Sequence, residues 1–519
     1  MLKGFFKTVA VVTVFSICEK FLGFLYRIFL SRTIGSEGIG LYQVALSVFA
    51  LLLTICSSGI PITVSRFMTK YRSQGKNAQV NKVITAGLSI TVMIALPICV
   101  LTFILNGNLG FLFADPRCKN IFLIVLPALC FNSVYSVLRG VFWGNKDFLP
   151  YSVIELLEEI CMIVVGVILI ALSSNVTEGA YGAGIAVLVS YIASFSLAVA
   201  VFFLRKNKLA NPKSEFKNLL FSSAPVTVMR TANSLAVSLV SVILPMRLIA
   251  AGMSSADALS SYGAAVGQAI PLLFIPTTLI GSFVLVLVPE ISENFYRKRY
   301  FYLKRDIEKS LKFTVFVSCL FIPVFVVCGR EIGVLIYDSA TAGEYLSSSA
   351  FLMFFMGISN ITTSVLNSIG FENKTLLYFV ISGILMLACI WVLPTFIGIY
   401  ALLVGFTFIY GLTSVLNLIK INKECKEKPA YLKFILSAAA LIAPTVLLGF
   451  MLKSLLLPLF GTALTFISVS AILVVFNALL YVGFNLIDIK TILLKIKKGF
   501  PLNPFRLFSR KRGKRSAQR

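Results

Sequence analysis

Long apolar runs repeat along the whole chain, and each is long enough to cross a lipid bilayer as a helix. A transmembrane helix needs about 20 apolar residues. Hydrocarbon offers no partner for backbone N–H and C=O groups, so such runs must be helical. Hydrophobic residues make up 58% of the 519 residues and charged residues 13%, which is more apolar than a soluble core requires. The sequence therefore predicts an all-α polytopic membrane protein.

Fourteen runs are predicted, and they group into lobes. The runs occupy residues 8–31, 39–65, 83–105, 120–143, 151–172, 180–204, 219–250, 264–289, 310–328, 346–368, 375–393, 399–419, 434–457 and 460–484. Polar pairs of runs, the first with the second and the seventh with the eighth, recur six runs apart, which predicts two pseudo-symmetric six-helix lobes. The predicted segments are an N-terminal lobe at 1–204, a cytoplasmic linker at 205–218, a C-terminal lobe at 219–419, two further helices at 434–484, and an amphipathic, polybasic cytoplasmic tail at 485–519.

Basic residues are distributed unevenly between the two sides of the predicted membrane. With the N-terminus inside, 37 of the 47 Lys and Arg residues fall in cytoplasmic segments and 5 in outer segments. This asymmetry follows the positive-inside rule and predicts that both termini are cytoplasmic. Basic stretches with interleaved aromatic residues, such as ENFYRKRYFYLKRD, are then expected to face anionic membrane lipids rather than nucleic acid.

Several enzyme chemistries lack the residues that they need. The chain has no histidine, which excludes histidine general bases and histidine-ligated zinc or haem. It has no G-x-x-x-x-G-K-[ST] loop for ATP. Its ten cysteines form no C-x-x-C pair, and we assign them no metal and no disulfide. We therefore expect a protein that is not an enzyme and that binds no cofactor.

Three charges lie inside the first run, in the stretch SICEKFLGFLYRIFLSR. A charge at mid-bilayer costs about 3 kcal/mol. Lys20, Gly23 and Arg27 share one helical face, with Glu19 beside them, and Gly23 is expected to leave open space between the two cations. We predict that Lys20 and Arg27 line a cavity and bind an anion. The alternative is a buried ion pair with Glu19 that packs this helix against a neighbour.

Further polar side chains lie within the second, seventh and eighth runs. The seventh run carries a stripe of hydroxyl groups at helical spacing, from Thr227 through Ser234 to Ser241. Such a stripe either lines a cavity or joins helices together, and Arg230 near its start favours the cavity. The predicted substrate-binding residues beyond the first run are Arg230, Arg247, Gln43, Asn233, Ser234 and Gln268.

A third polar group spans the fourth and fifth runs, in VLRGVFWGNKDFLPYSVIELLEE. Arg139 and Lys146 precede a tight turn, and three glutamates follow it. The main prediction is structural pairing across this turn, and the alternative is a carboxylate that binds a coupling cation or proton. The predicted structural or coupling residues are Glu19, Arg139, Glu155 and Glu159.

Four blocks of the sequence resemble a known family. They are LGFLYRIFLSRTIGSEGIGLYQ, SGIPITVSRFMTKY, LRGVFWGNKDFLPYSVIELLEE and GQAIPLLFIPTTLIGSFVLVLVPEISENF. They resemble the stage V sporulation protein B and polysaccharide-flippase branch of the multidrug/oligosaccharidyl-lipid/polysaccharide exporter superfamily. The resemblance covers the first twelve runs. It implies two six-helix lobes around a central cavity, and undecaprenyl-diphosphate-linked saccharides as the substrate class.

The resemblance also implies a cavity lined by arginines, as in the related lipid II flippases. The eighth run of this chain, around Gln268, lacks the arginine that those flippases carry there. Arg230 and Arg247 are the candidates to replace it.

Together, these observations predict a flippase or exporter in the bacterial cell membrane. We expect it to move an undecaprenyl-diphosphate-linked saccharide, a peptidoglycan precursor or a polysaccharide repeat unit, from the inner to the outer leaflet by alternating access. A cationic cavity would bind the diphosphate. The alternatives are a cation-coupled multidrug antiporter of the same fold, a membrane enzyme acting on lipid-linked sugars, and a non-transporting cell-wall assembly scaffold. We expect a monomer, with Na⁺ or H⁺ as the candidate coupling ion.

Overall fold

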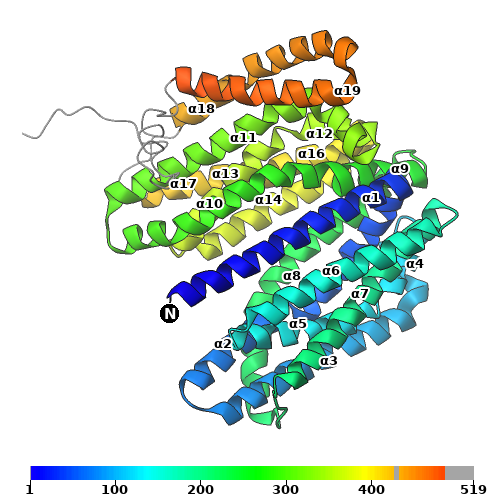
Figure 1. Ribbon diagram of the computed structural model, residues 1–519, viewed down its shortest axis with the longest axis vertical. Coiled ribbons are helices and arrows are strands. Elements are labelled where there is room, and N and C mark those ends of the chain that lie inside the picture. The colour runs from blue at the N-terminus through cyan, green and yellow to red at the C-terminus, as the bar shows by residue number, and fades with distance from the viewer. Residues whose placement is uncertain (1, 426–431, 485–519) are drawn as a thin grey trace, which may run out of the picture. The chain divides into compact units, whose positions relative to one another are not determined.

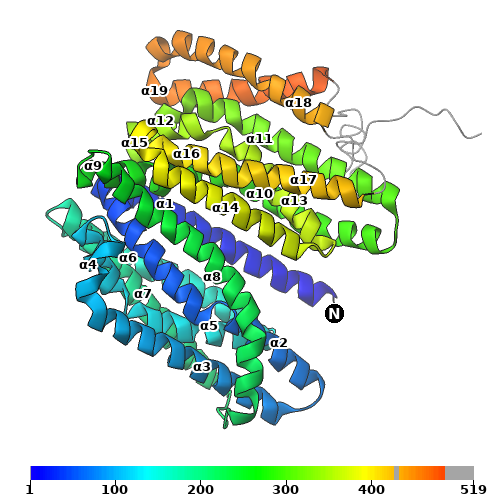
Figure 2. The same cartoon turned by 180° about the vertical axis from the view of Figure 1, so that it is seen from behind.

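The computed structural model describes residues 2–425 and 432–484, which form helices and connecting turns without any strand (Figures 1 and 2). The all-α prediction is confirmed. Nine helical stretches of these residues are long and apolar enough to cross a membrane, or up to eleven when each of two bent pairs counts as one span. The chain is therefore a multi-pass membrane protein. The predicted tail at 485–519 lies outside the described residues.

Two glycines explain part of the difference from the fourteen predicted spans. Helix α1 (Leu2–Ser57) continues from the first predicted span into the second, and only Gly35, at φ 66°, departs from helical geometry. Helix α19 (Ile442–Gly483) joins the last two predicted spans in the same way, with Gly461 at φ 69°. Glycine adopts this backbone conformation without steric cost, so one residue bends the chain where a loop was expected. The count of fourteen is not confirmed.

The contacts within the chain define two compact units, Met1–Gly267 and Gln268–Arg519. Their boundary falls inside a π-helix, η2 (Gly263–Ala269). The other helices of the first unit are α2 (Ile60–Ser73), α3 (Asn77–Ile104), η1 (Leu105–Leu112), α4 (Pro116–Val125), α5 (Ala128–Gly144), α6 (Phe148–Ala171), α7 (Val176–Leu204), α8 (Lys213–Ala250) and α9 (Ser255–Tyr262).

The helices of the second unit begin directly after this boundary. They are α10 (Ile270–Tyr296), α11 (Tyr300–Tyr337), α12 (Ala340–Ser349), α13 (Leu352–Ser368), α14 (Glu372–Val392), α15 (Pro394–Ile397), η3 (Gly398–Tyr400), α16 (Ala401–Phe406), η4 (Thr407–Leu412), α17 (Thr413–Glu424), α18 (Leu432–Ala440) and α19. The sequence-based division into lobes with a linker at 205–218 concerns an internal repeat and stays a prediction.

A shared apolar core places α8 in the first unit. Val64 of α2, Ile84 of α3 and Leu219 of α8 are buried side by side in one cluster. Gly140 lets α5 approach α2 so closely that a Cβ at this position would lie 2.5 Å from the carbonyl oxygen of Pro61. Because the packing here involves backbone as well as side chains, the helices that carry the polar residues of this unit are held at short distances from one another.

Helix α11 organises the second unit by packing against α10, α12, α13 and α19. Gly333 of α11 and Gly343 of α12 meet at a crossing where a Cβ on Gly333 would lie 2.4 Å from the backbone nitrogen of Gly343. Lys453 of α19 pairs with Glu331 of α11 at 2.8 Å. The last described helix is therefore joined to the centre of its unit by a charge pair as well as by apolar contact.

Candidate functional site

Lys20 and Arg27 lie on α1, on one side of the helix. Lys20 is exposed and Arg27 is half-buried. The Arg27 guanidinium donates a hydrogen bond from Nη1 to the backbone carbonyl of Gly267 at 3.2 Å. Neither cation, nor Glu19, takes part in an ion pair among the described residues. The alternative, an ion pair between Glu19 and Arg27, is therefore not formed among the described residues.

The open space expected at Gly23 is absent, and this expectation was wrong. A Cβ on Gly23 would lie 2.8 Å from Oε1 of Glu159. Helix α6 packs against α1, and the missing side chain of the glycine admits a carboxylate from α6 at that point. The spacing of residues along α1 identified the face of the helix but carried no information about which neighbour covers it.

The predicted structural or coupling residues come together within the first unit. Arg139 of α5 pairs with Glu155 of α6, with 3.3 Å between Nη1 and Oε1. Glu19 interacts electrostatically with Glu155, Lys20 and Arg139, and Glu159 interacts with Glu19. Lys146 is exposed and forms no ion pair among the described residues. The cluster therefore sets two cations, Arg139 and Lys20, against the carboxylates of Glu19, Glu155 and Glu159, so the carboxylates are in excess.

Arg230 is an exposed cation on α8 without a carboxylate partner among the described residues. Its Nη1 donates to the backbone carbonyl of Ser58 at 3.4 Å, at the break between α1 and α2. Asn233 on the same helix is exposed. The Ser234 hydroxyl lies 3.4 Å from Oγ1 of Thr54. Arg230 and its neighbours thus lie where α8 contacts α1.

Two residues of the hydroxyl stripe on α8, Thr227 and Ser241, contact neighbouring elements. Ser241 is buried and accepts a hydrogen bond from the Tyr262 hydroxyl at 2.6 Å. Thr227 covers Gly59, where a Cβ would lie 2.4 Å from its hydroxyl oxygen. These two residues join helices together, which is the alternative role considered for the stripe.

The remaining predicted ligands differ in accessibility. Gln43 on α1 is half-buried, and so is Arg247 in the last turn of α8. Gln268 is fully buried, with 0% of its surface exposed. In this structure Gln268 is therefore closed to a ligand, whereas Gln43 and Arg247 are partly accessible.

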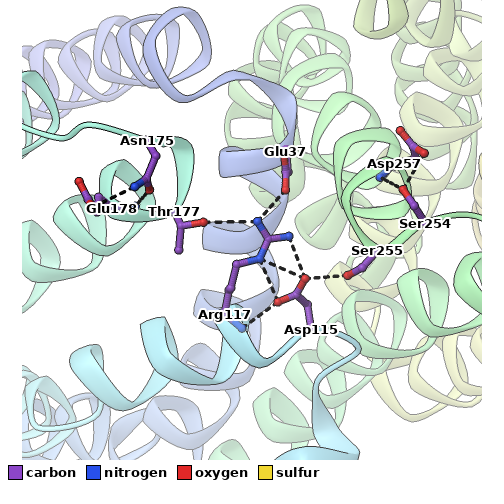
Figure 3. A network of polar contacts seen from close by, with 9 residues as sticks. All are labelled: Glu37, Asp115, Arg117, Asn175, Thr177, Glu178, Ser254, Ser255 and Asp257. Carbon is purple, nitrogen blue, oxygen red and sulfur yellow. Dashed lines mark hydrogen bonds and ion pairs between the residues drawn. The ribbon is translucent and has the colours of Figure 1, made fainter.

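A network around Arg117, missed by the sequence analysis, joins four elements of the first unit (Figure 3). Arg117 of α4 pairs with Glu37 of α1 at 2.7 Å and with Asp115 at 2.9 Å. Its Nη1 also lies 3.3 Å from the Thr177 hydroxyl of α7. Ser255 of α9 donates to Oδ2 of Asp115 at 2.6 Å. We call these five residues the Arg117 network.

Asp115 combines two functions in this network. It precedes Pro116, and its side chain accepts a hydrogen bond from the backbone N–H of Arg117, so it caps the first turn of α4. The order Asp-Pro at a helix start is a capping signal that the sequence alone displays. Burial raises the pKa of the Asp115 carboxyl, but the hydrogen bonds from Arg117 and Ser255 outweigh this effect and hold the pKa below its ordinary value of 3.8.

Comparison with known proteins identifies relatives along most of the chain. Residues 5–295 match the family described as polysaccharide biosynthesis protein. Stage V sporulation protein B of Bacillus subtilis (strain 168) is 24% identical over 405 residues, which cover 75% of this chain and 78% of the relative. Lipid II flippase MurJ of the same organism is 27% identical over 354 residues, which cover 63% of each chain.

Solved structures share the fold. A lipid II flippase MurJ in an inward closed conformation aligns with a TM-score of 0.71 at 15% identity, covering 92% of this chain and 99% of the other. An inward-facing multidrug resistance transporter of the MATE family aligns with a TM-score of 0.65 at 12% identity, covering 82% of this chain and 95% of the other. At these identities the alignments establish the fold, which is one that occurs in flippases and transporters.

Proposed function

The chain belongs to the polysaccharide biosynthesis protein family, and from this premise we propose that it is a flippase for lipid-linked saccharides. Its substrate would be an undecaprenyl-diphosphate-linked saccharide that moves from the inner to the outer leaflet by alternating access. Relatives and fold neighbours named as flippases for lipid II support this substrate class. Both termini would be cytoplasmic, as the distribution of basic residues predicts.

The observation that carries the proposal is that Lys20, Arg27 and Arg230 have no carboxylate within ion-pair distance among the described residues, although Lys20 interacts electrostatically with its chain neighbour Glu19. A cation at mid-bilayer costs about 3 kcal/mol on insertion scales. These three lie in helical stretches apolar enough to span a membrane, yet form no ion pair among the described residues. Arg27 and Arg230 each donate to a backbone carbonyl, which leaves most of their N–H groups for other acceptors. A diphosphate supplies those acceptors and the compensating charge.

The chemistry of the neighbouring side chains supports a saccharide next to the diphosphate. Asn233 is exposed beside Arg230, and Gln43 is half-buried on α1. Amide side chains both donate and accept hydrogen bonds, as sugar hydroxyl groups require. The membrane potential would provide the drive, because moving two negative charges outward releases about 4.6 kcal/mol per 100 mV.

The test is binding of undecaprenyl diphosphate to purified Arg27→Ala, together with transport in proteoliposomes. We expect transport to be abolished and binding to weaken, while thermal stability stays close to that of the wild type, because the substitution removes an uncompensated charge. Arg27→Lys should retain partial activity, since lysine keeps the charge but loses the planar fork. Arg297→Ala, which removes an exposed cation paired with Glu293, is the matched control and should behave as wild type.

Two outcomes would contradict the proposal. Wild-type binding by Arg27→Ala would show that this residue is not part of an anion site. Destabilisation of Arg27→Ala, with recovery of stability and activity in Glu19→Gln/Arg27→Gln, would show that the residue acts as a structural partner of Glu19.

The carboxylates of α6 favour coupling of transport to an ion. The same carboxylates are the observation that favours the second candidate function, a multidrug antiporter. Glu159 and Glu19 lie close together, and an oxygen of Glu158 is buried without a hydrogen-bond partner. A group of this kind suits H⁺ or Na⁺ as the coupling ion. If the chain is instead a multidrug antiporter, Glu159→Gln should abolish binding of tetraphenylphosphonium and leave binding of undecaprenyl diphosphate unchanged.

A further inference from the structure

A polar pocket of about 450 Å³ lies at the ends of α2 and α8, apart from the predicted substrate residues. Helix α2 contributes Phe67, Lys70 and Tyr71, which share one face at positions i, i+3 and i+4. Lys70 is exposed, and its ammonium lies 5.8 Å from the centre of the Tyr71 ring and 6.0 Å from that of Phe67. The two rings hold the ammonium at the wall of the pocket by cation–π attraction.

Helix α8 forms the opposite wall in a similar way. It contributes Lys217 and Asn218, and one turn later Phe221 and Ser222. The Lys217 ammonium lies 6.0 Å from the centre of the Phe221 ring. The Asn218 amide and the Ser222 hydroxyl add hydrogen-bond donors to the lining of the pocket. Each wall therefore presents one ammonium group beside an aromatic ring.

Neither lysine has a carboxylate partner among the described residues. Glu215 of α8, two residues before Lys217, is only 5% exposed and accepts a hydrogen bond from the Tyr71 hydroxyl at 2.8 Å. Its carboxylate is thereby directed to Tyr71 and removed from solvent. The pocket keeps two exposed cations against one buried carboxylate, so its net field favours an anion.

We propose that this pocket binds the phosphate of an anionic glycerophospholipid. Two lysines with amide and hydroxyl donors suit a phosphate group. Phe221 is 66% exposed and Leu220 is 36% exposed, which gives the acyl chains of the same lipid an apolar surface beside the pocket. Aromatic rings next to lysines are typical of the headgroup level of a membrane.

The pocket is separate from the proposed substrate site. Lys217 and Arg230 are on the same helix, and thirteen residues of α-helix span about 20 Å. A single phosphate group cannot contact both cations. The inference therefore goes beyond the proposed transport function, and it can hold or fail independently of that function.

The test is native mass spectrometry of the purified full-length chain with phosphatidylglycerol and with phosphatidylcholine. We expect the wild type to retain phosphatidylglycerol preferentially. Lys70→Gln/Lys217→Gln should bind it roughly 30-fold more weakly, because each lysine near an anionic headgroup contributes about 1 kcal/mol. Lys70→Arg/Lys217→Arg should keep the preference. Lys76→Gln/Lys208→Gln removes two cations of the same unit outside the pocket and is the matched control.

Competition then distinguishes the sources of phosphate. Unchanged phosphatidylglycerol binding by Lys70→Gln/Lys217→Gln would overturn the inference, and so would equal retention of the two lipids by the wild type. Displacement by millimolar inorganic phosphate would assign the pocket to free phosphate instead. Stronger displacement by undecaprenyl diphosphate than by added phosphatidylglycerol would assign it to the transported lipid. Arg27→Ala should leave phosphatidylglycerol binding unchanged, which separates this result from that of the transport test.

Discussion

The Arg117 network and the three cations Lys20, Arg27 and Arg230 are two charged regions of the same unit, and they differ in compensation. Arg117 lies between the carboxylates of Glu37 and Asp115. The three cations have no carboxylate at ion-pair distance among the described residues. Two of them, Arg27 and Arg230, donate hydrogen bonds to backbone carbonyls. A compensated charge can serve the fold alone, whereas an uncompensated one in an apolar helix needs a ligand or water to offset its cost.

Charge partners, rather than charge itself, separate structural from candidate functional residues in this chain. Similar substitutions in the two regions should therefore give opposite results. Removing a cation from the Arg117 network should reduce stability, and removing one of the three unpaired cations should reduce ligand binding.

The largest effect is expected for Arg117→Ala. The substitution leaves Asp115 buried and Glu37 partly buried without their cation, and breaking a buried pair in this way costs about 3 kcal/mol. Thermal unfolding of the purified protein should begin at a clearly lower temperature than in the wild type. Arg330→Ala, which removes an exposed arginine paired with Glu344, serves as the control and should have little effect. An unchanged unfolding temperature would remove the distinction between the two regions.

Arg230→Ala should show the reverse pattern, namely weaker ligand binding with unchanged stability. The expected change in binding free energy is smaller than the change in stability of Arg117→Ala. Binding of undecaprenyl diphosphate should weaken roughly tenfold, which corresponds to about 1.4 kcal/mol. The unfolding temperature should stay near that of the wild type, because Arg230 is exposed and, among the described residues, donates a hydrogen bond to the carbonyl of Ser58 without forming an ion pair. Arg230→Lys should bind better than Arg230→Ala. Loss of stability without loss of binding would place Arg230 with the structural charges.

Ser255→Ala tests the hydrogen bond that links α9 to the Arg117 network. The loss of one hydrogen bond to a carboxylate that keeps its arginine should cost about 1 kcal/mol. Chemical unfolding of the purified variant measures this difference. Ser348→Ala, at an exposed serine that bonds within its own helix, is the matched control. If both variants have the same stability, the contact of Ser255 with Asp115 is energetically silent.

The smallest effect is expected for the dependence of the unfolding temperature on acidic pH. The pKa of Asp115 is lowered in the folded protein, so its contribution to stability is present above its ordinary pKa near 3.8 and is lost as the pH falls through the folded value. The unfolding temperature of the wild type should therefore decrease more between pH 5 and pH 3 than that of Asp115→Asn. Parallel pH profiles of the two proteins would show that this carboxyl makes no acid-sensitive contribution.

The helical membrane fold was predictable because it depends on local composition, namely runs of apolar residues of membrane length. The pairing of Arg139 with Glu155 was also within reach, since only a tight turn separates their helices. The contact of Gly23 with Glu159 was not, because helical spacing gives the direction of a face and not the identity of its neighbour. Glu37 and Arg117 meet only through the packing of α1 and α4, and the local parts of that network are the Asp-Pro capping signal and the contacts of Asp115 with Arg117, two residues along the chain.

The link between Asp115 and Ser255 has a consequence for the biogenesis of the chain. The two residues are 140 positions apart, so Asp115 gains its serine partner only after α4 through α8 have been synthesised and inserted. Closing so long a loop is a late event in assembly, because its entropic cost precedes the contacts that compensate it. Completion of this contact would mark the maturation of the first unit, and truncated chains that end before α9 should remain substrates for membrane quality-control proteases.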